Sequence, residues 1–187
     1  MASFLEQGGF LLISMKTTRF GEIDVVEKDV IELPAGLIGF PELKRYVLLD
    51  HDKESPFKWL QSLDDGAIAF VLINPLLFMP DYTVEVSEAE IGELDLEDEE
   101  DAVISAIITM PSNPQNMTAN LKAPLVFNLK NRKGRQVILN NSQFTTRHNV
   151  MEEVKKRTEV ADTEAIKEVI NKVNESKLAL ENSSGSD

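Results

Sequence analysis

Short apolar runs, separated by glycine, proline, asparagine and aspartate, make up most of the first 150 residues. Within these runs valine, isoleucine, phenylalanine and threonine alternate with polar residues, and helical spacing is scarce. Such a pattern is typical of short strands with one buried face. It predicts strands at 17–20, 23–26, 30–33, 46–50, 58–63, 68–73, 83–86, 102–110, 118–122, 125–128 and 136–139. The expected fold is mainly all-β, a small β-barrel-like or sandwich domain.

Local signals add turns and one short helix to this pattern. Gly21 and Gly134 each stand alone between predicted strands, where a hairpin needs a residue with positive φ. A helix is expected at 87–94, because Ser87 as the N-cap and Glu90 three residues later match a capping box.

The pattern changes after about Val150. One helical face is formed by Ile166, Val169, Ile170 and Val173, with Asp162 as a possible N-cap. We expect this apolar stripe to dock on the β domain, and docking on a partner is the alternative. The last six residues, 182–187, are polar and small, which is typical of a disordered end.

Charge is abundant and unevenly distributed. The 187 residues carry 32 acidic and 19 basic side chains, a net charge of −13. Residues 1–101 contain 23 of the acidic and 7 of the basic side chains, whereas 102–150 contain 6 basic and no acidic ones. The total argues against general binding of nucleic acid and favours basic or apolar partners. The partition predicts a molecule with two electrostatic faces, provided that the two regions do not interleave in the fold.

The acidic excess is densest at 85–101, which holds ten carboxylates and no basic residue. A solvated surface explains this run, and a face for a basic partner is the alternative. Asp95, Glu97 and Glu99 alternate as calcium ligands do. However, Glu100 stands where an EF-hand loop needs glycine, which disfavours calcium.

Signals for catalysis are few. The chain has no cysteine, so it forms no disulfide, cysteine metal site or thiol nucleophile. No phosphate-binding glycine motif occurs. His148 lies beside an arginine and shows no catalytic context. An alternative function remains a carboxylate-based or calcium-dependent hydrolase that uses Asp50, His51, Asp64 and Asp65. Loops and turns at strand ends explain the same residues more simply.

Two further alternatives concern surfaces. The basic hairpin at 130–135 would suit an RNA-binding module, although no aromatic residues are interleaved with its charges. The segment 74–82 is bracketed by prolines and is apolar for a loop, which indicates a docking patch where Phe78 and Met79 meet a partner helix. Trp59 alternates with polar neighbours and is expected to pack in the core.

Six segments, taken together and in this order, resemble the FliW family of bacterial flagellar assembly factors. They are LPAGLIGFPE (33–42), PFKWLQS (56–62), AFVLINP (69–75), PDY (80–82), TANLKAP (118–124) and GRQVIL (134–139). The similarity spans about 15–148. It divides the chain into an N-terminal extension (1–14), a FliW-like β domain (15–150) and a C-terminal helix with a disordered tail (151–187).

The resemblance implies a non-enzymatic, cytoplasmic protein of β-barrel-like fold, without cofactor or metal. It implies binding to flagellin and, when the protein is free, binding to and antagonism of the translational repressor CsrA, so that flagellin synthesis follows the supply of free flagellin. No direct contact with nucleic acid or membrane is expected, and no run approaches the ~20 apolar residues of a membrane span. From the apolar and acidic segments, the residues expected to contact a partner are Phe78, Met79, Asp81, Tyr82, Glu85, Glu88, Glu97, Asp98 and Glu99.

Overall fold

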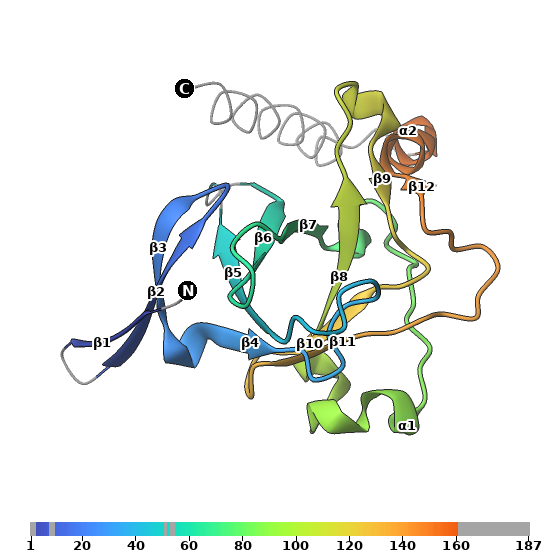
Figure 1. The fold of residues 1–187 in the computed structure, drawn as a ribbon. Helices are drawn as coiled ribbons and strands as arrows, with labels where there is room; N and C mark the ends of the chain where they lie inside the picture. Colours follow the sequence, from blue (N-terminus) through green and yellow to red (C-terminus); the bar gives the residue numbers. More distant parts are fainter. Residues whose placement is uncertain (1–2, 8–9, 51, 53–54, 161–187) are drawn as a thin grey trace.

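The computed structural model describes residues 3–7, 10–50, 52 and 55–160, and in this part of the chain seven strands close into a barrel (Figure 1). In order around the ring they are β4 (Val30–Glu32), β5 (Arg45–Asp50), β6 (Phe57–Ser62), β7 (Ala69–Ile73), β8 (Ala102–Thr109), β10 (Leu125–Asn128) and β11 (Lys133–Gln136). The mainly β, barrel-like fold expected from the sequence is thereby confirmed.

Two long-range pairings close the ring. The long strand β8 pairs with β10 through its first half and with β7 through its second half, and its end also pairs with β9 (Thr118–Ala119). On the opposite side β11 pairs with β4 in parallel, with Lys133 opposite Glu32. The Glu32 N–H donates to the Arg132 carbonyl at 2.8 Å. All other neighbours in the barrel are antiparallel. A two-residue strand, β12 (His148–Asn149), extends the sheet beyond β9.

A second sheet packs beside the barrel. It contains β1 (Ser3–Gln7), β2 (Phe10–Thr17) and β3 (Gly21–Val26), all antiparallel. The predicted turn at Gly21 is confirmed, since this residue has φ of +67°. The strand predicted at 17–20 is wrong, because Thr17 ends β2 and the next three residues form the turn. The start of β2 is continuously apolar, so the alternation of apolar and polar residues that marks a strand is not visible there.

The hydrophobic core has three parts. Inside the barrel, inward-facing residues of the strands form a cluster around Tyr46, Leu60 and Phe127. Between the barrel and the second sheet, Ile13 and Val25 belong to a smaller cluster. The largest cluster lies on the opposite outer face of the barrel, beneath the irregular segments and the C-terminal helix α2 (Val150–Val160). Most barrel strands therefore have apolar residues on both faces, which explains their weak alternation.

Gly134 lies inside β11 and not in a turn. A Cβ at this position would lie 2.6 Å from the ring of Phe127, so glycine is needed for close packing. The turn occupies 129–132 instead, where Arg132 has φ of +59°. As a result, the strand predicted at 136–139 begins and ends earlier, at Lys133–Gln136. The strand predicted at 83–86 does not form.

Two α-helices are described. The predicted helix at 87–94 is confirmed as α1 (Glu88–Ile91) followed by a 3-10 turn (Gly92–Leu94). The backbone N–H and the hydroxyl of Ser87 both donate to the Glu90 carboxylate, at 2.8 and 2.7 Å. Helix α2 buries Val150, Met151 and Val154 in the largest cluster. The predicted stripe at 166–173, its N-cap Asp162 and the predicted disordered end lie outside the described residues.

Candidate protein-interaction surface

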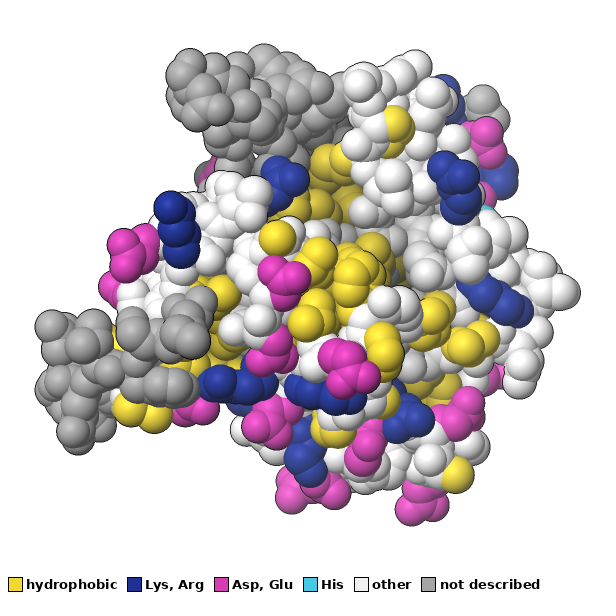
Figure 2. Space-filling view, in the orientation of Figure 1, with side chains coloured by type: hydrophobic (Ala, Val, Ile, Leu, Met, Phe, Trp, Pro, Cys, Tyr) yellow, Lys and Arg dark blue, Asp and Glu magenta, His cyan; other side chains and the backbone are white. Residues whose placement is uncertain are grey.

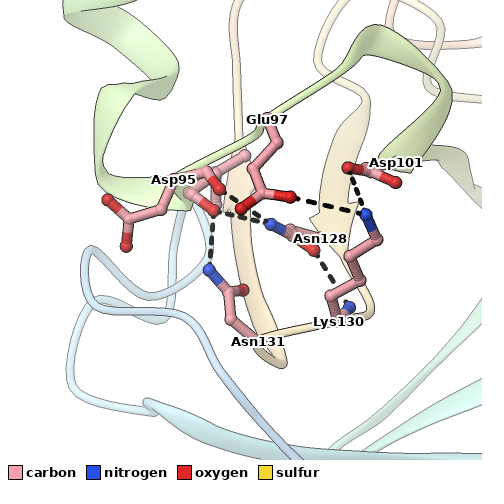
Figure 3. A network of polar contacts seen from close by, with 7 residues as sticks. Asp95, Glu97, Asp101, Asn128, Lys130 and Asn131 are labelled. Atoms are coloured by element: carbon pink, nitrogen blue, oxygen red, sulfur yellow. Dashed lines mark hydrogen bonds and ion pairs between the residues drawn. The ribbon is translucent and has the colours of Figure 1, made fainter.

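The acidic segment between α1 and β8 is held against the turn between β10 and β11. The Asn128 side-chain amide donates to the carbonyls of Leu94 at 2.9 Å and Asp95 at 3.2 Å. The Asn131 amide donates to the same Leu94 carbonyl at 2.8 Å (Figure 3). Asp95 has φ of +49°, which turns the chain at this point. Asn128 is only 2% exposed, so its amide is a buried anchor for an otherwise exposed segment.

Ion pairs connect the same two segments. Lys130 lies 2.8 Å from Asp101 and 3.7 Å from Glu97, and Lys133 lies 2.5 Å from Asp95. The hydrogen bond from Lys130 to Asp101 raises the pKa of this lysine, so its charge is retained. Further along β11, Arg135 pairs with Glu93. We call residues 93–101 and 129–135 together the charge clasp.

The charge clasp corrects the expectation of two electrostatic faces. In Figure 2 basic and acidic side chains are interspersed along the lower edge of the molecule. The basic region at 130–135 thus neutralises part of the acidic run, although 29 or more positions separate the paired residues. Arg132, at the tip of the turn, lies 3.6 Å from Asp29. Because each cation of this turn has a carboxylate partner, the turn offers little free charge to RNA phosphates.

Several of the predicted partner-binding carboxylates remain outside the strongest pairs. Glu85, Glu88 and Asp98 are exposed, and no ion pair is described for them. Glu97 is 81% exposed and makes only the 3.7 Å contact. The side chain of Glu99 lies outside the described residues. These carboxylates keep a net negative surface around α1 and the charge clasp.

Glu85 also borders a small recess. Together with Thr83, Leu139, Asn140 and Asn141 it lines a pocket of about 140 Å³. Small-molecule sites typically occupy ~300–1,000 Å³. The recess is thus too small for a typical cofactor. It is a shallow depression in the surface beside the acidic segment.

The aromatic side chains of the apolar segment at 74–82 are internal. Phe78 is 1% and Tyr82 is 3% exposed, and Met79 is half-buried against the same core cluster. The Tyr82 hydroxyl donates to the Leu121 carbonyl at 2.8 Å, and burial raises the pKa of this tyrosine. The interpretation of Phe78 as an exposed docking residue is therefore wrong.

The segment contains a 3-10 turn (Pro75–Leu77) in which Pro75 is buried, and its exposed residues are Asn74, Leu76, Leu77, Pro80 and Asp81. Leu76 is 43% and Leu77 is 37% exposed. Arg157 of α2 donates to the Leu77 carbonyl at 2.9 Å, which ties the turn to the helix. Sequence patterning cannot separate these two leucines from the buried phenylalanine beside them, because the segment has no regular period.

The candidate catalytic carboxylates have structural roles. Asp64 accepts hydrogen bonds from the backbone N–H groups of Lys44 and Arg45, at 2.6 and 2.9 Å. Asp65 accepts from the Ala67 N–H at 2.9 Å, within its own turn. Asp50 pairs with Lys58 at 2.5 Å, and His51 lies outside the described residues. In the part of the chain that the structure describes, no three His, Cys, Asp or Glu residues gather as metal ligands.

Trp59 packs outside the barrel rather than within it. Trp59 and Phe20 meet edge-to-face with 5.5 Å between ring centroids, and the Arg19 guanidinium lies 4.4 Å from the Trp59 ring centroid. Phe20 and Arg19 both belong to the turn between β2 and β3, so the only tryptophan anchors the second sheet to the barrel. The prediction that Trp59 is a core residue is confirmed, since it is 4% exposed.

None of the helices that the structure describes has the length and apolarity required to cross a bilayer. Fold and surface together define a small β-barrel protein whose main surface feature is a charged contact region around α1. Comparison with known proteins places this barrel in a family. The model of the family described as FliW protein matches residues 14–150. The chain belongs to the FliW family.

Relatives support the assignment along most of the chain. The flagellar assembly factor FliW of Alkaliphilus metalliredigens (strain QYMF) is 43% identical over 146 residues, which are 78% of this chain and 90% of the relative. That of Syntrophus aciditrophicus (strain SB) is 42% identical over 139 residues, 74% of this chain and 88% of the relative. A solved structure, the crystal structure of the flagellar assembly factor FliW, has a TM-score of 0.68 and 36% identity, covering 73% of this chain and 96% of its own.

FliW is a family of regulatory assembly factors and not of enzymes. The family predicted from the six sequence segments is thus confirmed. The hydrolase alternative is excluded by this assignment, in agreement with the structural roles of Asp64 and Asp65.

Proposed function

We propose that this flagellar assembly factor acts in the cytoplasm as a switch between two protein partners. It binds flagellin before export and, when flagellin is absent, binds and antagonises the translational repressor CsrA. Flagellin synthesis then follows the supply of free flagellin. The observation that carries this proposal is membership of the FliW family across residues 14–150, with relatives that are named flagellar assembly factors.

The acidic surface around α1 supports a role in partner recognition. Glu85, Glu88 and Asp98 are exposed, with no ion pair described for them, and Asp81 is exposed at the end of the apolar segment. Negative potential of this kind steers a basic partner and repels nucleic-acid phosphates. We propose these four residues, with Glu97 and Glu99, as contacts for the basic partner. Beneath this surface, the side chains of three residues pack in the core and thereby hold its backbone in place. They are Phe78, Met79 and Tyr82.

The proposal is tested by mixing the purified full chain with flagellin and, separately, with CsrA on a sizing column. We expect a stable complex with each partner at micromolar concentration, which corresponds to a binding free energy of roughly −8 kcal/mol. Absence of a complex with both partners at that concentration would refute the proposed function. A complex with only one would refute the switch.

A further inference from the structure

The strand β3 has a free edge. It pairs with β2 on one side, and in the described part of the chain no strand pairs with its other side. Figure 1 shows the hairpin of β2 and β3 beside β4 and β5, at one side of the barrel. An edge strand of six residues presents unpaired N–H and C=O groups, and native proteins usually cover or block such an edge. The sequence of β3, Gly21–Val26, contains no proline and no lysine that would block it.

A pocket of about 270 Å³ lies next to this strand. Its apolar lining includes Val25 of β3 and Val47 and Leu49 of β5, and its polar lining includes Asp24, Asp29 and Arg132. The volume is just below the ~300–1,000 Å³ of typical small-molecule sites. The pocket therefore suits individual side chains of a bound chain better than a whole cofactor.

The side-chain pattern of β3 indicates what an added strand would carry. Val25 is 4% exposed and faces the cluster between sheet and barrel, with Ile23 half-buried beside it. Glu22 and Asp24 lie on the opposite, exposed face. On β2, Lys16 stands opposite Glu22, whereas only Ser14 stands opposite Asp24. Among the described residues, Asp24 has no ion pair.

We propose that the free edge of β3 binds an extended segment of another protein in which apolar residues alternate with lysine or arginine. Apolar side chains of that segment enter the pocket beside Val47 and Leu49. The basic side chains lie on the exposed face, opposite Asp24, where cross-strand pairs of opposite charge stabilise a sheet. Main-chain hydrogen bonds to β3 supply affinity, and the pocket supplies specificity.

A second copy of this chain is a poor occupant of the same edge. Antiparallel pairing of β3 with itself, with the apolar faces on one side, places Glu22 opposite Asp24 of the other copy when it is centred on Ile23, and Asp24 opposite Asp24 when it is centred one residue later. Carboxylates directly opposite each other destabilise a sheet. The acidic pattern therefore selects a basic partner over self-association.

The experiment uses the full chain labelled with ¹⁵N and a capped hexapeptide of alternating lysine and valine. A hexapeptide of alternating glutamate and valine is the matched control. We expect amide shifts to change along Gly21–Val26 and at Val47 and Leu49, with hydrogen exchange slowed in β3 by the lysine peptide only. Equal binding of the two peptides, no binding, or shift changes confined to other surfaces would overturn the proposal.

A pair of charge reversals locates the site. Asp24→Lys is expected to weaken binding of the lysine peptide about fivefold, through loss of one cross-strand charge pair and gain of a repulsion. Glu152→Lys makes the same charge change at an exposed position of α2 and is expected to leave the affinity within about twofold. Equal effects of the two variants would contradict the site. This surface deepens the proposed partner-binding function, but the peptides contain neither flagellin nor CsrA, so failure here is distinguishable from failure of that function.

Discussion

At the scale of single residues, backbone space and hydrogen-bond geometry decide positions that hydrophobic patterning misreads. Gly134 looks like a turn residue in the sequence, yet it lies in β11 because the Phe127 ring occupies the space of a Cβ. Glu90 was predictable as part of a capping box, since Ser87 and Glu90 are only three positions apart. Burial of Phe78 was not predictable, because its segment follows no strand or helix period.

Gly134→Ala tests the packing argument. The added Cβ would meet the Phe127 ring at 2.6 Å and Leu33 at 3.3 Å, so we expect a loss of about 1–3 kcal/mol in the free energy of unfolding, the usual cost of overpacking. Urea denaturation followed by tryptophan fluorescence measures this loss. Gly92→Ala is the matched control, since nothing lies within 4 Å of its added Cβ. Equal stability of the two variants would contradict the account.

The Ser87–Glu90 capping box predicts a pH dependence. The backbone N–H and hydroxyl of Ser87 donate to the Glu90 carboxylate and hold the pKa of Glu90 below its ordinary value. The cap therefore stabilises α1 fully at neutral pH, and this contribution is lost as the pH falls through the lowered pKa. The Ser87 amide shift should titrate below the ordinary glutamate range and not titrate there in Glu90→Gln. A midpoint at or above that range would refute the cap.

At the scale of elements, local pattern identifies strands but not how they pair. Most barrel strands were predictable because apolar residues mark at least one of their faces. The segment at 83–86 alternates equally well, but Val84 and Val86 pack on the core without a neighbouring strand to pair with. The parallel pairing of β11 with β4 joins residues about a hundred positions apart, and no local signal contains it. The ion pairs of the charge clasp likewise join segments that are far apart in the sequence, so no local signal predicts them.

Asn128→Ala and Lys130→Ala separate the buried anchor beside the charge clasp from the exposed ion pairs within it. Asn128 is buried and donates to the Leu94 and Asp95 carbonyls, so its loss removes both bonds at a cost of about 1–3 kcal/mol, while the Leu94 carbonyl keeps its bond from Asn131. This loss should not depend on salt. Lys130→Ala should destabilise less, and the effect should shrink as salt screens the exposed pairs. Urea unfolding at low and high ionic strength measures both, and salt-dependent loss in Asn128→Ala would contradict the anchor.

At the scale of the whole molecule, the net charge of −13 takes on a more specific meaning. Part of the acidic run is used internally in the charge clasp, and the carboxylates around α1 that remain unpaired in the described chain face solvent. This distribution favours protein partners with basic surfaces and leaves the turn at 129–132 little capacity for RNA. The composition predicted a negative surface charge, but only the fold shows which carboxylates remain without a basic partner.

Association with the basic partner should therefore depend on salt. For the wild-type chain and CsrA, stopped-flow association rates should fall as ionic strength rises, because screening removes electrostatic steering. The triple variant Glu85→Gln, Glu88→Gln, Asp98→Gln should associate more slowly and with a weaker salt dependence. As a single-charge control, Glu152→Gln at an exposed position of α2 should keep a dependence close to wild type. If the association rate of the wild-type chain did not depend on salt, the acidic surface would have no role in recognising the partner.

The proposed switch requires that one protein bind flagellin and CsrA in alternation. The most direct measurement is a calorimetric titration of CsrA into the full chain, alone and after saturation with flagellin. We predict micromolar or tighter binding to the free chain and loss of that binding when flagellin is present. Unchanged affinity for CsrA in the flagellin-saturated protein would contradict the claim.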